Sequence, residues 1–477
     1  MKASLTKTDQ LILRLILKFS QSKNVRLYIV GGFLRDIVLG RSKINPDIDF
    51  ALKKNAIKFA ALLARHLKAG FVILDKANGC ARLVKKTPDK VYTLDFTDFR
   101  GEDLSKDLGK RDFSINALAV GLEEFLKDSD YRLIDFYQGL NDLKTKVIKA
   151  LNQKVFDDDP LRILRTFSLS CILGFKIEPK TLKLAVRKKG KLKGVSFERI
   201  RDELFKILTS PKGYQFLVQL DGYKIAELIF PEIKAMRKLA QGPYHHLDVW
   251  QHTLETIMHL ERIIKNSSRN PEIRDYLNQG ISSGRRRREL IKLAGLMHDI
   301  GKPKTLRIEK GKVKFHGHER LGAHMFEGVA KRLKLSNHEA AIIKKMIFLH
   351  LRPGYLADGA VLTRRARFRF FRDAAGEAVS VLLISLADQR ATKGPLATAE
   401  SRRRHERVVR RLIKEYFQKS QEQKPTRLVN GNDLIKRFRL EPSPLIGRIL
   451  SEIEELQAIG KIKTKKQALS RAKKLIT

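Results

Sequence analysis

The pattern of apolar and polar residues changes character along the chain. Between residues 24 and 120, short runs rich in β-branched and aromatic residues predict strands. These runs are "VRLYIV", "DIDFAL", "FVILD" and "KVYTLDFTDF". A helical period appears between them, as in "NAIKFAALLARHLKAG". From about residue 157 onward the pattern becomes almost entirely helical. The sequence therefore predicts an α/β N-terminal head followed by an all-α remainder.

Breaks in this pattern predict where the parts of the chain begin and end. We expect a head over 1–149, a helical neck over 150–235, a third part over 236–400 and a helical C-terminal region over 401–477. The polar stretch "KNSSRNPEIRDYLNQGISSGRRRREL" predicts a loop inside the third part.

The apolar runs are too short to cross a membrane, because none approaches the ~20 residues that a spanning helix needs. The most apolar N-terminal run, "LILRLILKF", is interrupted by Arg14 and Lys18. It predicts an amphipathic first helix and not a signal peptide. The only cysteines, Cys80 and Cys171, cannot form a zinc site by themselves. They fit a reducing cytoplasm, so we expect a cytoplasmic protein with no membrane partner.

Charge then narrows the class of partner. A hydrophobic content of 43% excludes a wholly disordered chain. The formal net charge is +45, from 97 Lys and Arg against 52 Asp and Glu. This excess indicates a polyanionic partner, most simply nucleic acid, with a membrane surface as the competing interpretation. The densest basic runs are "GRRRREL", "TRRARFRFFRD" and "SRRRHERVVRRLIKE". They predict either phosphate contacts or ordinary solvated helix faces.

Two carboxylates lie two residues apart in "INPDIDFAL". In a strand, residues i and i+2 point to the same face, so Asp47 and Asp49 would meet the same cations. Two Mg²⁺ ions bridged by carboxylates can activate a hydroxyl and hold a triphosphate. A polar turn after Pro46 is the alternative. Upstream, "YIVGGFLRDIVLG" places Gly31-Gly32 before a helix. Such a turn lets the backbone approach a phosphate at the helix N-terminus.

The motifs occur together in a family's order. "VGGFLRD", "PDIDFAL", "GKRDFSINALAV", "DDPLRILRTFSLSCILGF" and "FERIRDEL" cover roughly residues 25 to 230. In this order and spacing the chain resembles the class II tRNA nucleotidyltransferase (CCA-adding enzyme) and bacterial poly(A) polymerase family. The resemblance implies a polymerase-beta-like nucleotidyltransferase head over 1–149 and a neck that binds the nucleotide base and RNA.

The resemblance also implies roles for individual residues of the head. Asp47 and Asp49 would bind catalytic Mg²⁺, and Gly32 and Arg35 would hold the triphosphate. Arg111, in Lys110-Arg111-Asp112, would contact the nucleotide. A third carboxylate commonly completes such sites, and Asp95 and Asp112 compete for that place. Our choice among catalytic residues is Asp47, Asp49 and Asp95.

A base reader is predicted in "DDDPLRILR". Asp159 accepts hydrogen bonds and Arg162, three residues on, donates them. Cytosine and adenine both offer an amino donor beside a ring-nitrogen acceptor, so the pair would accept CTP and ATP and repel GTP and UTP. Arg165 continues the same face. The alternative is that Asp159 merely caps a helix whose first residue is Pro160.

The helical middle of the chain carries histidines and aspartates at metal-ligand spacing. His252, His298-Asp299 and Asp388 could surround one divalent metal ion of unidentified kind. Further histidines are His316, His318, His324 and His350. Together with "HDIGKPKT" and "HGHERLGA", the pattern resembles an HD-type phosphohydrolase domain, which we place at 236–400. Each histidine taken alone is more often a core or surface residue than a ligand.

The sequence thus predicts template-independent addition of CMP and AMP to the 3′ end of tRNA, with pyrophosphate released. Poly(A) polymerase, CC-only addition and A-only addition are alternatives on the same scaffold. An HD phosphohydrolase whose head serves as an RNA-binding scaffold is a second class. A non-catalytic RNA-binding protein is a third. The tail, with "NGNDLI" and "PSPLIGRIL", resembles the family's C-terminal segment, which implies a small helical body that extends the RNA-binding surface.

Overall fold

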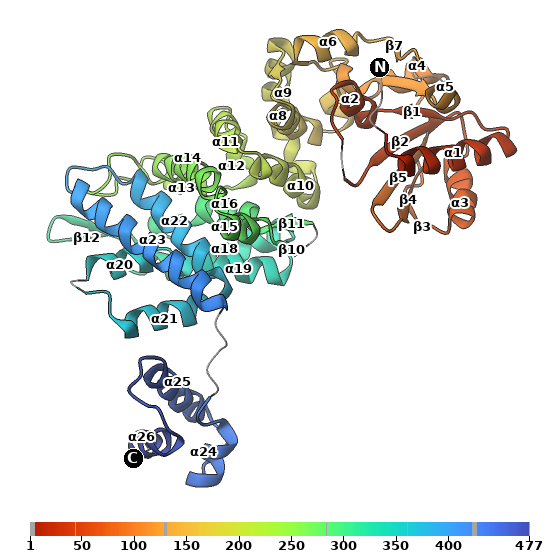
Figure 1. The fold of residues 1–477 in the computed structure, drawn as a ribbon. Helices are drawn as coiled ribbons and strands as arrows, with labels where there is room; N and C mark the ends of the chain where they lie inside the picture. The colour runs from red at the N-terminus through yellow and green to blue at the C-terminus, as the bar shows by residue number, and fades with distance from the viewer. Residues whose placement is uncertain are drawn as a thin grey trace. The chain divides into compact units, whose positions relative to one another are not determined.

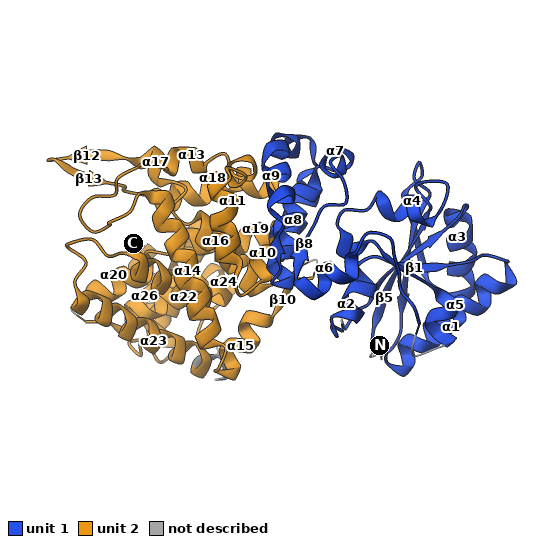
Figure 2. Ribbon diagram, turned by 90° about the horizontal axis from the view of Figure 1, so that it is seen from above, with its two compact units in different colours: residues 1–204 blue, residues 205–477 orange. Residues whose placement is uncertain are grey.

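A computed structural model describes residues 5–476 except 43, 128–130, 283, 360 and 422–426. The chain divides into two compact units, residues 1–204 and 205–477 (Figure 2). The division falls inside helix α10 (Phe197–Thr209), within the predicted neck. The head is α/β and the remainder is mostly helical, as the hydrophobic pattern predicts (Figure 1).

The head is built on a mixed sheet, in which the described residues form seven strands in the order β3-β4-β5-β2-β1-β6-β7. The strands are β1 (Tyr28–Val30), β2 (Asp47–Leu52), β3 (Gly70–Asp75), β4 (Cys80–Lys86), β5 (Val91–Asp98), β6 (Leu118–Gly121) and β7 (Ile134–Asp135). Only the central pair β2 and β5 is parallel; the other neighbours run antiparallel. The four predicted strands are confirmed as β1, β2, β3 and β5, and β4, β6 and β7 join them as strands that the sequence pattern did not predict.

One face of the sheet carries the main core of the head. Helices α1 (Lys7–Ser22), α3 (Ala56–Leu67) and α5 (Leu122–Lys127) bury their apolar stripes in the same cluster as Ile48, Phe50 and Phe96. The rings of Phe50 and Phe96 stack with centroids 4.8 Å apart. The first helix is amphipathic, as predicted, and buries Ile12, Leu13 and Ile16. The opposite face carries only a smaller cluster, which includes Val30, Ala51 and Ala119.

Alternation along β2 separates charge from core. Ile48, Phe50 and Leu52 are buried, whereas Asp47 is exposed and Asp49 is half-buried. Because side chains alternate along a strand, both carboxylates lie on the face opposite α1 and α3. The predicted shared face is therefore confirmed.

Short elements and helices complete the first unit. They are α2 (Gly32–Val38), α4 (Leu104–Gly109), η1 (Ser114–Asn116), α6 (Gly139–Thr145), β8 (Val147–Ile148), α7 (Val155–Asp158), α8 (Leu161–Leu173), β9 (Lys176–Ile177), α9 (Pro179–Lys188) and η2 (Lys189–Gly194).

The second unit is a helical body around the apolar helix α22 (Ala378–Ala391), which is buried along most of its length. A helix that is apolar on all sides belongs in the interior of a helical domain. Its companions are α11 (Gly213–Gly222), α12 (Ala226–Ile229), α13 (Ile233–Met236), α14 (Val249–Ser267), α15 (Pro271–Asn278), α16 (Arg287–Met297), α17 (Lys302–Thr305), α18 (His318–Arg332), α19 (Asn337–Leu349), α20 (Arg352–Asp358), α21 (Arg364–Ala374), η3 (Ala375–Glu377) and α23 (Ala399–Gln421). Two small hairpins, β10 (Gly280–Ser282) with β11 (Arg285–Arg286) and β12 (Arg307–Glu309) with β13 (Lys312–Lys314), interrupt the helices.

The polar loop predicted over 265–290 is wrong. That stretch contains the end of α14, the whole of α15, the β10–β11 hairpin and the start of α16. The Asn270 side chain accepts a hydrogen bond from the Ile273 backbone N–H (3.2 Å), and Pro271 occupies the first turn. An Asn cap followed by Pro is a helix-start signal, which the polar composition concealed.

The basic run "GRRRREL" is only partly a solvated face. Arg285 and Arg287 are buried, and they pair with Glu339 and Glu377. These two arginines hold helices together and are not available to a polyanion.

The C-terminal helices form a core of their own. Helices α24 (Gly431–Phe438), α25 (Pro444–Ala458) and α26 (Lys465–Ile476) enclose a cluster that includes Leu434, Ile449 and Ile453. The predicted small helical body is confirmed in its fold. Among the described residues, no helix is long and apolar enough to span a membrane.

We expect Phe96→Ala to lower the free energy of unfolding of the head by about 3–5 kcal/mol, since it removes a buried ring and leaves a cavity against Phe50. Urea unfolding followed by circular dichroism measures the change. Phe71→Ala is the matched control, because Phe71 lies on the edge strand β3 and is 36% exposed. Equal losses in the two variants would contradict the assignment of the core to the α1/α3 face.

Candidate active site and metal cluster

Three neighbouring strands place Arg82, Asp95 and Asp49 in one row, and a fourth strand leads into the glycine turn beside it. The Cα partner of Asp49 on β2 is Asp95 on β5, and the partner of Asp95 on β4 is Arg82. On the other side, Asp49 is opposite Val30, the last residue of β1 before the glycine turn. The register thus brings two of the predicted catalytic carboxylates side by side next to that turn.

Asp95 is held by an arginine that the sequence analysis did not identify. Arg82 donates from Nε to Oδ1 and from Nη2 to Oδ2, both at 2.7 Å. The hydrogen bonds to Asp95 raise the pKa of Arg82, and the charges of Asp47 and Asp49 add to the effect. A bidentate guanidinium offsets the repulsion among the three neighbouring carboxylates.

Asp112, the other candidate for third carboxylate, has different surroundings. It is buried and accepts hydrogen bonds from the Phe113 backbone N–H (2.8 Å), Asn116 Nδ2 (2.9 Å) and Arg165 Nη1 (3.3 Å). Burial opposes ionisation, but the charge of Arg165 and these hydrogen bonds outweigh it and lower the pKa of Asp112. The oxygens of Asp112 therefore accept hydrogen bonds from neighbouring protein groups, whereas Asp95 lies beside Asp49 on the adjacent strand.

The glycine turn is shaped by Gly31. Its φ is +80°, and a Cβ placed there would lie 2.7 Å from Asp49 Oδ2 and 3.2 Å from Arg111 Nη1. Only a residue without a side chain lets the turn approach Asp49 and Arg111 this closely. The sequence analysis selected Gly32, where a Cβ would meet nothing nearer than Arg35 Nη2 at 3.4 Å. The positive φ that distinguishes Gly31 is not visible in a Gly-Gly pair.

Arg35 is buried and already bonded. Its Nε and Nη2 donate to Asp36 Oδ1 at 2.9 and 2.7 Å, and Nη1 donates to Asn116 Oδ1 at 2.8 Å. Arg35 and Asp36 thus form an ion pair in the interior and not at the surface. Most of the Arg35 donors therefore stabilise the glycine turn through Asp36 and Asn116.

These contacts join into one hydrogen-bonded chain. Asn116 links Arg35 to Asp112, and Asp112 links to Arg165. Arg165 Nε then donates to Glu203 Oε1 (3.2 Å) on α10, and Ser168 on α8 donates to the same carboxylate. The chain therefore runs from α2 behind the glycine turn to the neck helices. Arg165, predicted to bind nucleotide, is part of it.

Arg162 and Asp159, the residues predicted to bind the base, each contact other protein groups in the structure. Arg162 is buried and donates to the backbone carbonyls of Lys110 (Nη2, 3.0 Å) and Arg111 (Nη1, 3.2 Å). Asp159 Oδ2 accepts a hydrogen bond from Arg199 Nη2 (2.8 Å), a residue that the sequence analysis did not single out. Arg162 thus fixes the loop that presents Arg111, and Asp159 lies against a half-exposed arginine.

The helix start near Asp159 differs by one residue from the expectation. Helix α8 begins at Leu161 with Pro160 as its N-cap residue. Asp159 Oδ1 still accepts a hydrogen bond from the Leu161 backbone N–H (3.2 Å), so it assists the helix start as well as contacting Arg199.

A second cluster lies in the interior of the helical body. His252 on α14 lies 2.9 Å from Asp388 on α22, measured from Nε2 to Oδ1. His298 Nε2 lies 3.1 Å from Asp299 Oδ2. His252, His298 and Asp388 form one group whose ligand atoms could share a metal ion, and His298, Asp299 and His350 form another. All four residues predicted for the HD site are therefore brought together.

Backbone carbonyls aim the imidazoles at the centre of this cluster. The Nδ1 atoms of His298, His318 and His350 lie 2.7–2.8 Å from the carbonyls of Gly295, Phe315 and Ile347. Among the described residues, their Nε2 atoms and both Asp299 oxygens lack a well-formed hydrogen bond. Buried polar atoms without partners, oriented by a second shell of carbonyls, are typical of metal ligands.

The close packing of the cluster shifts the pKa values of Asp299 and His350. Burial opposes ionisation of Asp299, but His298 and Lys302 outweigh it and hold the pKa of Asp299 well below its usual range. Burial lowers the pKa of His350 to about 3, so His350 is neutral and able to ligate a metal. Lys302 Nζ lies 2.7 Å from Asp299 Oδ2.

Not every histidine noted in the sequence joins the cluster. His318 Nε2 lies 3.2 Å from Asp299 Oδ1, and His350 Nε2 lies 3.9 Å from the same oxygen. His316 and His324 are exposed. Spacing alone could not separate His318 and His350 from His316 and His324, because the choice depends on which side chains the tertiary contacts bring to Asp299.

A mixed sheet with a paired-aspartate row and glycine turn, followed by a helical body with a histidine–aspartate cluster, defines a nucleotidyltransferase with an HD-type domain. Profiles of known families agree with this class. The poly A polymerase head domain matches residues 27–149, and the RNA- and SrmB-binding site of polymerase A matches 174–237. The HD domain matches 249–393, and the second domain of tRNA nucleotidyltransferases matches 395–472.

Relatives that match over nearly their whole length are also nucleotidyltransferases. The chain is 30% identical over 448 residues to an A-adding tRNA nucleotidyltransferase of Deinococcus radiodurans, covering 92% of this chain and 93% of the relative. It is 27% identical to a CC-adding tRNA nucleotidyltransferase of Synechocystis sp., covering 94% and 93%. The protein belongs to the tRNA nucleotidyltransferase and poly(A) polymerase family, and it is a nucleotidyltransferase.

Solved structures share the fold at lower identity. A Thermotoga maritima CCA-adding enzyme complexed with tRNA has a TM-score of 0.62 at 23% identity, covering 99% of this chain and 97% of that one. A CCA-adding enzyme in complex with ATP has a TM-score of 0.64 at 22% identity, covering 99% and 95%.

We expect Gly31→Ala to lower the rate of nucleotide transfer by about a hundredfold, since the added methyl group displaces Asp49 or Arg111 and the residue is strained at positive φ. Single-turnover kinetics measures the loss. Gly32→Ala should cost less, because its methyl group meets only the end of a flexible arginine. A larger loss in Gly32→Ala than in Gly31→Ala would contradict this reading of the turn.

Proposed function

We propose that the protein adds CMP and AMP to the 3′ end of tRNA without a template, using CTP and ATP and releasing pyrophosphate. The observation that carries this proposal is that Asp49 lies opposite Asp95, beside the Gly31 turn and Arg111, with Asp47 two residues away on the same face of β2. Relatives named as A-adding and CC-adding tRNA nucleotidyltransferases support it. Related structures contain tRNA, ATP or CTP, and the charge of +45 suits an RNA partner.

The carboxylates fit Mg²⁺. Asp47 and Asp49 present hard oxygen donors on one face of β2, which is the donor type that Mg²⁺ prefers. When bound, the ions would neutralise phosphate charge and lower the pKa of the attacking hydroxyl. Asp95 could join them only when its bidentate contact with Arg82 opens, so we propose that Arg82 positions this third carboxylate.

The protein groups of the head would then serve one transfer step. The 3′-hydroxyl of the RNA attacks the α-phosphate of the nucleotide, and the bond to pyrophosphate breaks. The Gly31-Gly32 turn and Arg111 would hold the triphosphate next to Asp49. Arg35 would stabilise the turn, with any N–H left over from Asp36 and Asn116 directed to phosphate.

Base choice is proposed for Asp159, Arg162 and Arg165. An acceptor from Asp159 beside an arginine donor matches cytosine and adenine, as argued from the sequence. Asp159 would have to share or leave Arg199 to accept the amino group of a base. Arg162 would read the base with donors that do not bind the carbonyls of Lys110 and Arg111.

We also propose the finer organisation and location. The head would cover 1–149, the neck 150–235, the HD domain 236–400 and the RNA-binding tail 401–477. A cytoplasmic location follows from the tRNA substrate.

Replacing Asp47 and Asp49 by Ala should reduce nucleotide incorporation about a thousandfold, because metal-bound carboxylates contribute several kcal/mol to transition-state stabilisation. The assay uses tRNA transcripts ending before C74, after C75 and after A76, with labelled CTP or ATP, read at single-nucleotide resolution on a gel.

Products extended by C, C and then A support full CCA addition. An A-only enzyme would extend only the transcript that ends after C75. A CC-only enzyme would extend only the transcript that ends before C74, and it would add two residues. Long A tracts on generic RNA would instead identify a poly(A) polymerase. Incorporation that survives both alanine substitutions would contradict the assignment of the active site.

A second activity is proposed for the HD domain. Its buried cluster of imidazole Nε2 atoms and carboxylates suits a divalent metal, held by His252, His298, Asp299 and Asp388, with His318 and His350 able to complete the set. Such a site would hydrolyse phosphomonoesters or 2′,3′-cyclic phosphates.

We expect His298→Ala to weaken Mn²⁺ or Ni²⁺ binding at least about tenfold, since even second-shell changes cost that much. Equilibrium dialysis with metal analysis measures binding, and p-nitrophenyl phosphate and 2′,3′-cyclic AMP test hydrolysis. His316→Ala is the control, because His316 is exposed and outside the cluster. Unchanged metal binding in His298→Ala would exclude the site.

A further inference from the structure

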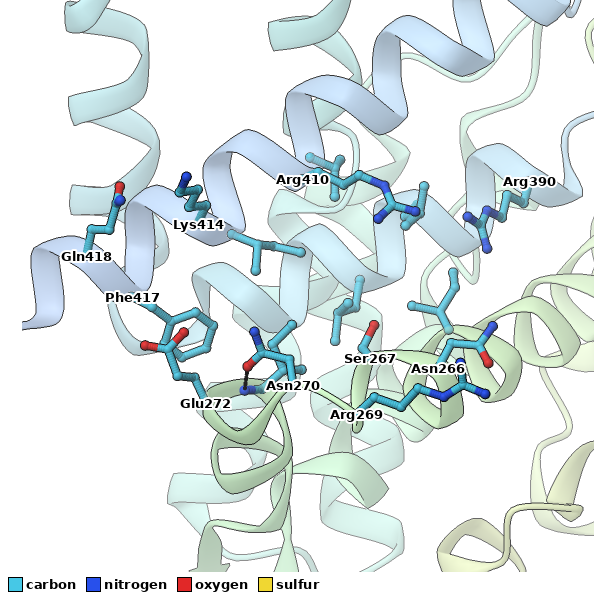
Figure 3. Close-up of a pocket in the computed structure, with 16 residues that line it drawn as sticks. Asn266, Ser267, Arg269, Asn270, Glu272, Arg390, Arg410, Lys414, Phe417 and Gln418 are labelled. Carbon is cyan, nitrogen blue, oxygen red and sulfur yellow. Dashed lines mark hydrogen bonds between the residues drawn. The ribbon is translucent and has the colours of Figure 1, made fainter.

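A pocket of about 740 Å³ lies at the surface of the helical body. It is bounded by the end of α14, the start of α15, α22 and α23 (Figure 3). A volume of this size is typical of small-molecule sites, and no residue of the HD cluster lines it.

The pocket has an apolar floor. Ile263, Leu383 and Val409 are buried beneath it, and Phe417 closes one end. On α23, Val409, Ile413 and Phe417 are spaced by four residues, so they form one stripe along the helix. The floor is therefore a regular feature of helix packing and offers an apolar surface to an apolar or aromatic group.

The rim on α23 and α22 is cationic. Arg410 and Lys414 follow Glu406 at intervals of four, so they form a second stripe next to the apolar one. Arg390 and Arg410 both donate to Glu406 Oε1, at 3.0 and 2.7 Å, and are thereby directed along the same rim. Among the described residues, Lys414 and Arg269 have no carboxylate at ion-pair distance. Four cations around the pocket thus face two acids, Glu406 and Glu272.

The opposite wall offers amide and hydroxyl groups. Asn266, Ser267 and Asn270 lie across the pocket from Arg410 and Lys414, and Glu272 lies near Phe417 (Figure 3). Asn270 Oδ1 accepts from the Ile273 N–H, which leaves its amino group as a donor at the pocket. Amide donors and acceptors beside an apolar floor match the polar edge and the apolar face of a nucleobase, whereas an acyl chain has no polar edge for them to bind.

We propose that this pocket binds a nucleoside phosphate, with the base on the apolar floor and the phosphate against Arg410 and Lys414. The site is separate from the nucleotidyltransferase head and goes beyond the proposed function. The same chemistry is present in a free nucleotide and in one nucleotide of an RNA strand, so the experiment must distinguish these sources.

The probe is 8-azido-AMP, photo-crosslinked to the full-length protein in EDTA and mapped by peptide mass spectrometry. Crosslinks are expected in the peptides that carry Asn266–Asn270 or Phe417. Arg410→Gln with Lys414→Gln should reduce crosslinking at these peptides about tenfold. The matched control is Arg407→Gln with Arg411→Gln, which removes the same charge at the same spacing from exposed positions of α23 outside the pocket. Far-ultraviolet circular dichroism verifies that both variants fold.

Competition identifies the source of the ligand. Displacement of the probe by AMP supports a free nucleotide, and displacement by a pentanucleotide at tenfold lower concentration supports a strand of RNA. Absence of crosslinks in these peptides, equal loss in the two double variants, or displacement by decanoate but not by AMP would overturn the proposal. The readout is a mapped crosslink and not nucleotide incorporation, so its failure would leave the assignment of the head unaffected.

Discussion

The register between the parallel strands β2 and β5 is the constraint on which the active site depends. It pairs Asp49 with Asp95, while the antiparallel partner β4 brings Arg82 to the same row. A slip of one residue would turn every side chain of a strand to the other face. The register is held by Phe50 and Phe96, which stack on the covered face directly after the two aspartates. The core on one side of the sheet thereby fixes the position of the charges on the other side.

Carboxylates held close together repel one another, and each of the two clusters offsets this repulsion with a different kind of cation. In the head, Arg82 supplies a bidentate counter-charge to Asp95. In the helical body, His298 and Lys302 stabilise the ionised form of Asp299 against burial. In the HD cluster this keeps Asp299 charged, which is the state in which a carboxylate binds cations. The difference is access, because the head site is partly exposed whereas the HD cluster lies in the interior.

The neck is coupled to the glycine turn by polar contacts. The chain from Arg35 through Asn116, Asp112 and Arg165 to Glu203 crosses from α2 to α10. Since buried polar groups need their partners, loss of one member leaves the next unsatisfied. The nucleotide-binding turn and the helices proposed to read the base are therefore positioned by one network.

A basic motif in the sequence does not by itself mark a surface for RNA. Arg285 and Arg287 belong to such a motif, yet both are buried in ion pairs with glutamates.

The sequence by itself determined the features that depend on local periodicity and on short motifs. Strand alternation placed Asp47 and Asp49 on one face, the helical period separated the α/β head from the helical body, and spacing singled out His252, His298, Asp299 and Asp388. Only the tertiary structure separated the surroundings of Asp95 from those of Asp112, showed the positive φ of Gly31, and introduced Arg82 and Arg199. It also separated His318 and His350, which lie near Asp299, from the exposed His316 and His324. It also showed Arg162 bound to backbone carbonyls and a helix where a polar loop was expected. These choices depend on which strands pair and which helix faces meet, because such contacts join residues far apart in the chain and leave no period in the sequence.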